Sequence, residues 1–99
     1  VNPFENHGSA VFYYQPQSLP LARAIQGELL AVLGLPDFGV GLGNLALARP
    51  TEMPAVLTEA AFMMLPEQEE LLRTPEFQQR EAEAIRRGIE RFLRESREP

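Results

Sequence analysis

A single carboxylate at the end of a short apolar run is the clearest candidate for chemistry in this sequence. The run M-P-A-V-L occupies residues 53–57, Thr58 follows it, and Glu59 ends it. A buried strand that ends in one acid is a common way for an α/β enzyme to present a general base at the carboxyl edge of its sheet. Glu59 is therefore the candidate catalytic residue. The residues alone leave a second interpretation open, in which Glu59 only ends a strand in solvent.

The composition limits which partners and cofactors the chain could bind by itself. It has 99 residues with one histidine and no cysteine, so disulfides and thiolate metal sites are excluded. The formal net charge is −5, and the nine basic residues are all arginines, most of them interleaved with glutamates. Because phosphate-backbone binding needs a clustered positive surface, we expect no nucleic acid and no anionic membrane as partner. No apolar run approaches the ~20 residues that cross a bilayer, so no membrane insertion is expected.

A glycine-rich stretch at residues 35–44 could be mistaken for a phosphate-binding loop. It lacks the G-x-G-x-x-G spacing, and no helix start follows that could direct backbone amides at an anion. We interpret it as a turning loop with a short extended piece.

Hydrophobic periodicity predicts the order strand, helix, strand, strand, helix, helix. The expected elements are strands at 8–14, 45–48 and 54–59, a helix capped by Ser18 and ended by Gly34, a short helix at 66–72, and a long final helix after Thr74 whose apolar stripe faces a sheet. This order predicts an α/β fold in which helices cover a mostly parallel sheet. Three strands would leave an apolar edge unpaired, which natural proteins avoid, so we expect only part of a sheet. Residues 95–99 carry no apolar side chain and are expected to fray.

Several short motifs in a fixed order together resemble a known family. They are G-S-A-V-F-Y-Y at 8–14, matching G-[ST]-x-V-[FY]-Y-Y; S-x-x-L-A-x-x-I from Ser18; Gly34-Leu35; Asn44-Leu45 with Arg49 and Thr51; M-P-A-V-L-T-E at 53–59 with Phe62; Pro66-Glu67 with Leu71-Leu72; and Ala84-Ile85 with Gly88-Ile89. The combination, from about residue 8 to residue 93, resembles the carboxyl-terminal half of the zinc-dependent N-acetylmuramoyl-L-alanine amidases that cleave bacterial peptidoglycan. The chain as a whole would then be the carboxyl-terminal portion of one catalytic domain.

The resemblance implies roles for particular residues. Glu59 would be the general acid/base beside a zinc-bound water. Zinc in the family is held by two histidines and a glutamate from earlier strands, so the ligands are expected upstream of Val1, in a missing amino-terminal half of the same domain. His7 adjoins the strand at Gly8 instead of ending an earlier one, and we interpret it as a loop residue, with no metal ligand in this chain. Asn44 and Arg49 are weaker candidates for contacting substrate or bracing the site, and Arg49 could also simply pair with Glu52.

The resemblance also implies a function for the parent protein. It would be exported to the periplasm or cell wall and would hydrolyse the amide bond between N-acetylmuramic acid and L-alanine in peptidoglycan. The 99 residues alone are expected to be inactive, because the zinc ligands lie elsewhere. The alternative is that the fold has been kept as a non-catalytic wall-binding or interaction module.

Overall fold

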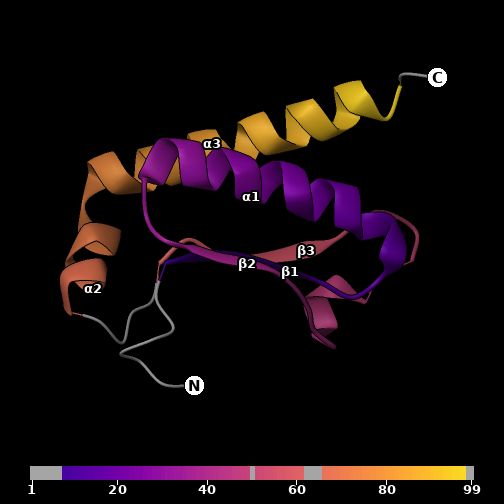
Figure 1. Cartoon of the computed structure of the whole chain (residues 1–99), viewed down its shortest axis with the longest axis horizontal. Helices are drawn as coiled ribbons and strands as arrows, with labels where there is room; N and C mark the ends of the chain where they lie inside the picture. The colour runs from indigo at the N-terminus through magenta and orange to yellow at the C-terminus, as the bar shows by residue number, and fades with distance from the viewer. Residues whose placement is uncertain (1–7, 50, 62–65, 98–99) are drawn as a thin grey trace.

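The computed structural model describes residues 8–49, 51–61 and 66–97, which form a small sheet, a helix packed on one of its faces, and further helices beside that helix (Figure 1). The elements, in chain order, are β1 (Ser9–Tyr13), η1 (Pro16–Ser18), α1 (Leu19–Leu33), β2 (Asp37–Leu42), η2 (Ala46–Ala48), β3 (Val56–Glu59), α2 (Pro66–Arg73) and α3 (Pro75–Glu95), where η denotes a short 3₁₀ helix. The predicted α/β class is confirmed.

The sheet has the strand order β2-β1-β3 and is mixed. β1 pairs with β2 in parallel and with β3 antiparallel, which corrects the prediction of a mostly parallel sheet. The antiparallel pairing matters for the site, because it brings the carboxyl end of β3 to the amino end of β1. Glu59 therefore lies opposite Ala10, near the start of β1.

Two predictions between the first helix and β3 are wrong. Residues 37–42, expected mainly as loop, form β2, and residues 45–48, expected as a strand, contain the 3₁₀ helix η2. The glycines of β2 have structural reasons: Gly39 has a φ of 95°, and a Cβ on Gly41 would lie 3.1 Å from the ring of Phe12. Gly39 allows a left-handed backbone conformation, and Gly41 makes room for the Phe12 ring. A strand with these glycines resembles a loop in composition.

Helix α1 covers one face of the sheet through the apolar residues Leu21, Ala22, Ile25 and Leu29. Its end is as predicted, since Gly34 adopts the left-handed conformation with a φ of 69°. Its start differs. Ser18 occupies the N-cap position but makes no capping bond, and its hydroxyl instead accepts a hydrogen bond of 2.9 Å from the Ala55 N–H.

Helix α3 packs against α1, which corrects the prediction that its apolar stripe faces the sheet (Figure 1). Phe77, Ala84 and Gly88 are buried in this contact, and a Cβ on Gly88 would come within 2.6 Å of the Ile25 Cα. The glycine therefore lets the two helices approach closely. The N-cap Thr74 accepts a hydrogen bond from the Phe77 N–H. The helix runs through Glu95, and residues 98–99 of the tail lie outside the described residues.

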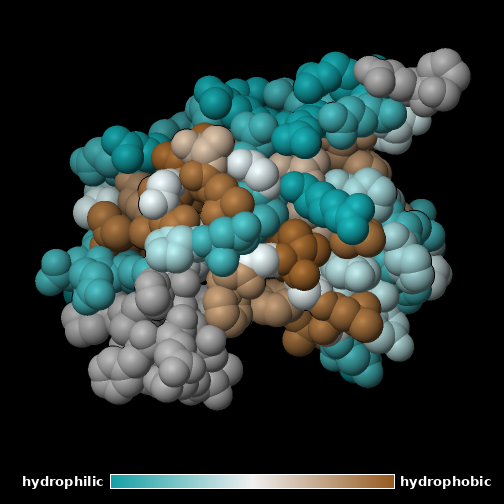
Figure 2. All heavy atoms as spheres, viewed as in Figure 1, coloured by the Kyte–Doolittle hydropathy of each residue, from teal (hydrophilic) through white to brown (hydrophobic). Residues whose placement is uncertain are grey.

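The outer face of α3 is charged, as expected for a solvated face. Ion pairs at helical spacing join Arg86 to Glu83 and Glu90. Figure 2 shows this hydrophilic surface along the top of the molecule, above apolar patches in the middle of the view. Partial burial raises the pKa of the Glu81 carboxyl on the same helix. Within the described ranges, no helix combines the length and apolar character needed to cross a membrane.

The two faces of the sheet differ. Strand alternation directs Val11, Val40 and Val56 towards α1, where they join the core. The same alternation places Phe12 and Glu59 on the opposite face. Among the described residues, no α-helix lies across that second face (Figure 1).

Candidate functional site

Glu59 is the last residue of β3, and its side chain is exposed. Its antiparallel partner is Ala10, and its side chain lies with that of Phe12 on the second face of the sheet, opposite α1. The position combines a regular strand backbone with a carboxylate that solvent can reach. Both interpretations of the sequence, a general base and an acid that only ends a strand in solvent, are compatible with this position, which lies at the amino end of β1.

The backbone that follows Glu59 is anchored by a buried serine. The Ser9 Oγ donates a hydrogen bond of 2.7 Å to the Ala60 carbonyl oxygen. Ser9 is fully buried and Ala60 is 4% exposed. The bond joins the start of β1 to the residue after the end of β3, and so extends the attachment of β3 beyond its last strand pair.

A β-bulge lies beside this anchor. Ser9 pairs with Asp37 and Ala10 with Gly39, so Phe38 is an extra residue in β2. A bulge interrupts the regular ladder, and the polar groups it frees need other partners. Here side chains provide them: the Gln26 Nε2 donates to the Ser9 carbonyl oxygen and to the Asp37 Oδ1, both at 2.8 Å.

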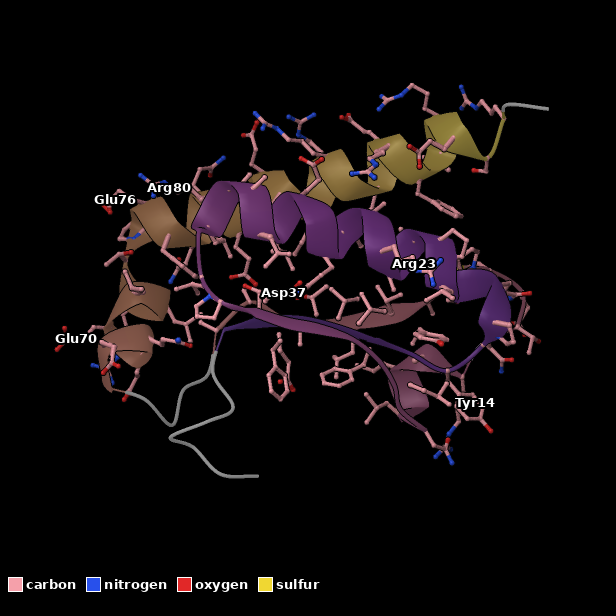
Figure 3. All side chains as sticks on the ribbon, in the orientation of Figure 1. Tyr14, Arg23, Asp37, Glu70, Glu76 and Arg80 are labelled. Carbon is pink, nitrogen blue, oxygen red and sulfur yellow. The ribbon has the colours of Figure 1, made fainter. Side chains whose placement is uncertain are left out.

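The same end of the sheet contains two further constraints. The Asp37 Oδ1 also accepts a 2.8 Å hydrogen bond from the Gly39 N–H. Gly8 has a φ of 117°, and a Cβ there would lie 2.0 Å from the Pro36 carbonyl oxygen. Figure 3 shows Asp37 between the sheet and α1, at the end away from Tyr14. We call Ser9, Gln26 and Asp37 the polar cluster; Ser9 and Gln26 are buried, whereas Asp37 is exposed.

Sequence reasoning missed the polar cluster, although a signal was present. Ser9 begins an otherwise apolar strand, and Gln26 lies next to Ile25 on a helix whose apolar residues face the core. A polar residue on a buried face needs a hydrogen-bond partner, and this need marks it as a structural or functional residue. The sequence does not reveal which partner it has.

Asn44 and Arg49 lie at the other end of the sheet. The Gly43 N–H donates to the carbonyl oxygen of Tyr13, the last residue of β1, so the segment beginning here adjoins the end of β1 that is remote from Glu59. The Arg49 Nε donates to the Asn44 Oδ1 at 2.8 Å. The structure thus joins these two residues to each other and separates both from Glu59.

This second end is held by exposed glutamines. The Gln15 Nε2 donates to the Arg49 carbonyl oxygen at 2.8 Å, and the Gln17 Nε2 donates to the Thr51 carbonyl oxygen at 2.9 Å. We call residues 43–51, apart from the undescribed residue 50, the far loop. Its bonds fix the segment that leads into β3.

The residues that the structure describes do not fit a zinc site. Across residues 8–49, 51–61 and 66–97, no group of three or more histidine, cysteine, aspartate or glutamate side chains could hold a metal ion. His7 and Phe62 lie outside the described residues. A zinc ion that acts beside Glu59 would therefore need ligands from outside the described residues.

Comparison with known proteins was consistent across sequence and structure. A cell wall amidase of Bacillus anthracis is 40% identical over 93 residues, covering 84% of this chain and 18% of the relative. The amidase AmiC of Neisseria meningitidis is 32% identical over 79 residues, covering 80% of this chain and 19% of the relative. The crystallised catalytic domain of the amidase CwlV from Bacillus (Paenibacillus) polymyxa superposes with a TM-score of 0.85 at 30% identity, covering 94% of this chain and 52% of that domain.

The chain therefore spans about half of a solved catalytic domain and less than a fifth of the curated relatives. Its α/β fold matches that of the amidase catalytic domains. Residues 1–91 match the family described as N-acetylmuramoyl-L-alanine amidase. This chain belongs to that family of peptidoglycan amidases.

Proposed function

We propose that the protein acts as part of a zinc-dependent N-acetylmuramoyl-L-alanine amidase, with Glu59 as the general acid/base. The reaction is hydrolysis of the amide bond between N-acetylmuramic acid and L-alanine in peptidoglycan. The observation that carries the proposal is the family match over residues 1–91, combined with an exposed carboxylate at the anchored end of β3. A parent enzyme that reaches this substrate is exported to the periplasm or the cell wall.

The proposed role of Glu59 is to move one proton during hydrolysis. Its carboxylate accepts a proton from the water that attacks the amide carbonyl carbon, and then gives it to the alanine nitrogen that leaves. A positioned acid/base of this kind contributes roughly 10²- to 10⁴-fold in rate. The exposure of Glu59 supports this role, because water and a glycan-linked peptide can both approach its side chain.

The metal part of the proposal concerns polypeptide beyond this chain. The described residues alone do not form a zinc site, so we propose that the ligands lie upstream of Val1, in the other half of the catalytic domain. The 99 residues by themselves should then be inactive. Adding zinc to the purified 99-residue chain should yield no hydrolysis of peptidoglycan.

The direct test uses the natural-length protein with Glu59→Gln, an isosteric change that removes the titrating carboxyl. Hydrolysis of purified muropeptides, followed by the new alanine amino groups, should fall about 10²-fold or more while bound zinc stays equal to wild type. Glu52→Gln, an exposed acid seven positions earlier, is the matched control and should keep full activity. Full activity in Glu59→Gln would refute the assignment of Glu59.

The alternative function is a wall-binding or interaction module without catalysis. The observation that favours it is the exposure of Glu59 at the end of β3, which an acid without a catalytic role would also show. It predicts that the natural-length protein sediments with insoluble peptidoglycan but carries no zinc and releases no alanine amino groups. Zinc content near one per protein chain would exclude this alternative.

A further inference from the structure

We propose that Ser9 is a positioning residue for Glu59: its buried hydroxyl holds the backbone beyond β3 so that the Glu59 carboxyl stays in a productive place. The inference rests on the proposed function of Glu59 and adds a residue to it. Ser9 itself does not touch substrate in this scheme, because its side chain lies on the α1 side of the sheet. It acts through the chain segment that carries Glu59.

The pairing of β3 with β1 is short and stops at Glu59. β3 has only four residues, and its ladder with β1 ends at the pair of Ala10 and Glu59. A residue at the end of a short strand is poorly restrained unless the chain beyond it is tied down. The Ser9 Oγ provides that attachment through its 2.7 Å bond to the Ala60 carbonyl oxygen.

Ser9 is itself held by hydrogen bonds to its backbone N–H and carbonyl oxygen. Its N–H donates to the Pro36 carbonyl oxygen at 2.9 Å, and its carbonyl oxygen accepts from the Gln26 Nε2 at 2.8 Å. It is fully buried. The backbone of Ser9 is thus tied both to the segment that leads into β2 and to α1, and its hydroxyl transfers this rigidity to β3.

The side chains of Glu59 and Ala60 lie on opposite sides of the sheet. Along β3 and into the next residue, successive side chains point to opposite faces, so Ala60 packs into the core on the α1 side while Glu59 projects from the second face. A hydroxyl on the covered face can therefore fix the backbone without obstructing the reactive face. Misplacement of a reacting group by about 1 Å can cost roughly 10²-fold in rate, so the restraint has catalytic value.

The chain offers a matched control for this role. Ser18 is also fully buried, and its Oγ also bonds to backbone next to β3, accepting from the Ala55 N–H at 2.9 Å. This second serine holds the start of the strand, whereas Ser9 holds its end. Removing either hydroxyl should cost similar stability, but only the loss of the Ser9 hydroxyl should move Glu59.

The experiment compares Ser9→Ala, Ser18→Ala and Ser9→Thr in the natural-length protein, using muropeptide hydrolysis, zinc content and thermal unfolding. We expect Ser9→Ala to lower kcat about 10-fold or more with KM within about 2-fold and zinc unchanged. Ser18→Ala should lower Tm by a similar amount yet keep kcat within about 2-fold. Ser9→Thr, which retains the hydroxyl, should recover kcat.

Equal kcat values in Ser9→Ala and Ser18→Ala would overturn the proposal. If Ser9→Ala does not fold, Ser9→Cys takes its place, since a thiol of similar size is only a weak donor and should give an intermediate kcat. Glu59→Gln, assayed alongside, distinguishes a failure of the proposed function of Glu59 from a failure of the positioning role of Ser9. An active Glu59→Gln variant means that the proposed function of Glu59 fails, whereas an inactive one with full activity in Ser9→Ala means that only the positioning role fails.

Discussion

The two ends of the sheet are both held by glutamine side chains that bond to backbone carbonyls, but they differ in burial. At the Glu59 end, Gln26 is 4% exposed and makes a buried hydrogen bond to the Ser9 carbonyl oxygen within the polar cluster. At the other end, Gln15 bonds to the far loop in an exposed setting. A buried donor or acceptor that loses its partner costs about 1–3 kcal/mol, whereas an exposed one is rehydrated at little cost. Among the glutamine bonds, those at the end with the candidate site are thus the more costly to break.

The largest expected effect at the Glu59 end comes from Gly8→Ala. A Cβ at this position would lie 2.0 Å from the Pro36 carbonyl oxygen, and the φ of 117° is unfavourable for alanine. We expect a loss of about 3 kcal/mol or more in the free energy of unfolding, measured by urea denaturation.

Gly34→Ala is the control for that change. Its φ of 69° is also left-handed, but nothing lies within 4 Å of its Cβ position. It should lose only about 1 kcal/mol, the conformational cost alone. Equal losses for the two variants would show that close packing against Pro36 does not restrain the start of β1.

The paired glutamines give a direct test of the difference in burial. Gln26→Ala removes two donated hydrogen bonds and leaves the buried Ser9 carbonyl without its partner, so it should destabilise the protein by about 2–3 kcal/mol. Gln15→Ala removes one exposed bond and should cost less than about 1 kcal/mol. Urea unfolding of both variants measures the contrast, and similar losses would abolish the proposed distinction between the ends.

The smallest expected effect on stability concerns Arg49, the residue whose bond to Asn44 closes the far loop. Because the pair is exposed, Arg49→Ala should change the free energy of unfolding by less than about 1 kcal/mol. If Arg49 only braces the loop, KM for muropeptides in the natural-length protein should stay within about 2-fold of wild type. A KM raised about 10-fold would instead assign Arg49 to substrate binding and extend the site to the second end of the sheet.

Local signals in the sequence predicted most of the helical part of this fold. Thr74 with its first-turn acid and Gly34 at a helix end are short-range devices whose effect does not depend on distant residues. β2 was missed because the reasons for its glycines, a bulge and the Phe12 ring, belong to the folded sheet. The packing of α3 on α1 was missed for a similar reason, since an apolar stripe does not specify its partner.

The candidate site was predictable in part. A strand-end glutamate could be identified from local composition, and Glu59 is the last residue of β3. Its catalytic role stays a prediction. The hydrogen bond that anchors the chain after Glu59 could not be predicted from the sequence, because the Ser9 hydroxyl bonds to a carbonyl 51 residues away. The direction of β3 was equally hidden, since antiparallel pairing with β1 is decided by the folded chain. That direction is why Asn44 and Arg49 are remote from Glu59.

Because β3 has only four residues, the hydrogen bonds of Ser9 and Ser18 beside it have a second consequence. Sliding this strand past β1 by one residue would exchange its faces, turning the glutamate under α1 and presenting a neighbouring residue in its place. Four residues of pairing offer weak protection against such an error. The hydrogen bonds of the Ser9 and Ser18 hydroxyls lie just outside the two ends of β3 and would resist such a slide. They therefore help to fix the face of the sheet from which the Glu59 carboxylate projects.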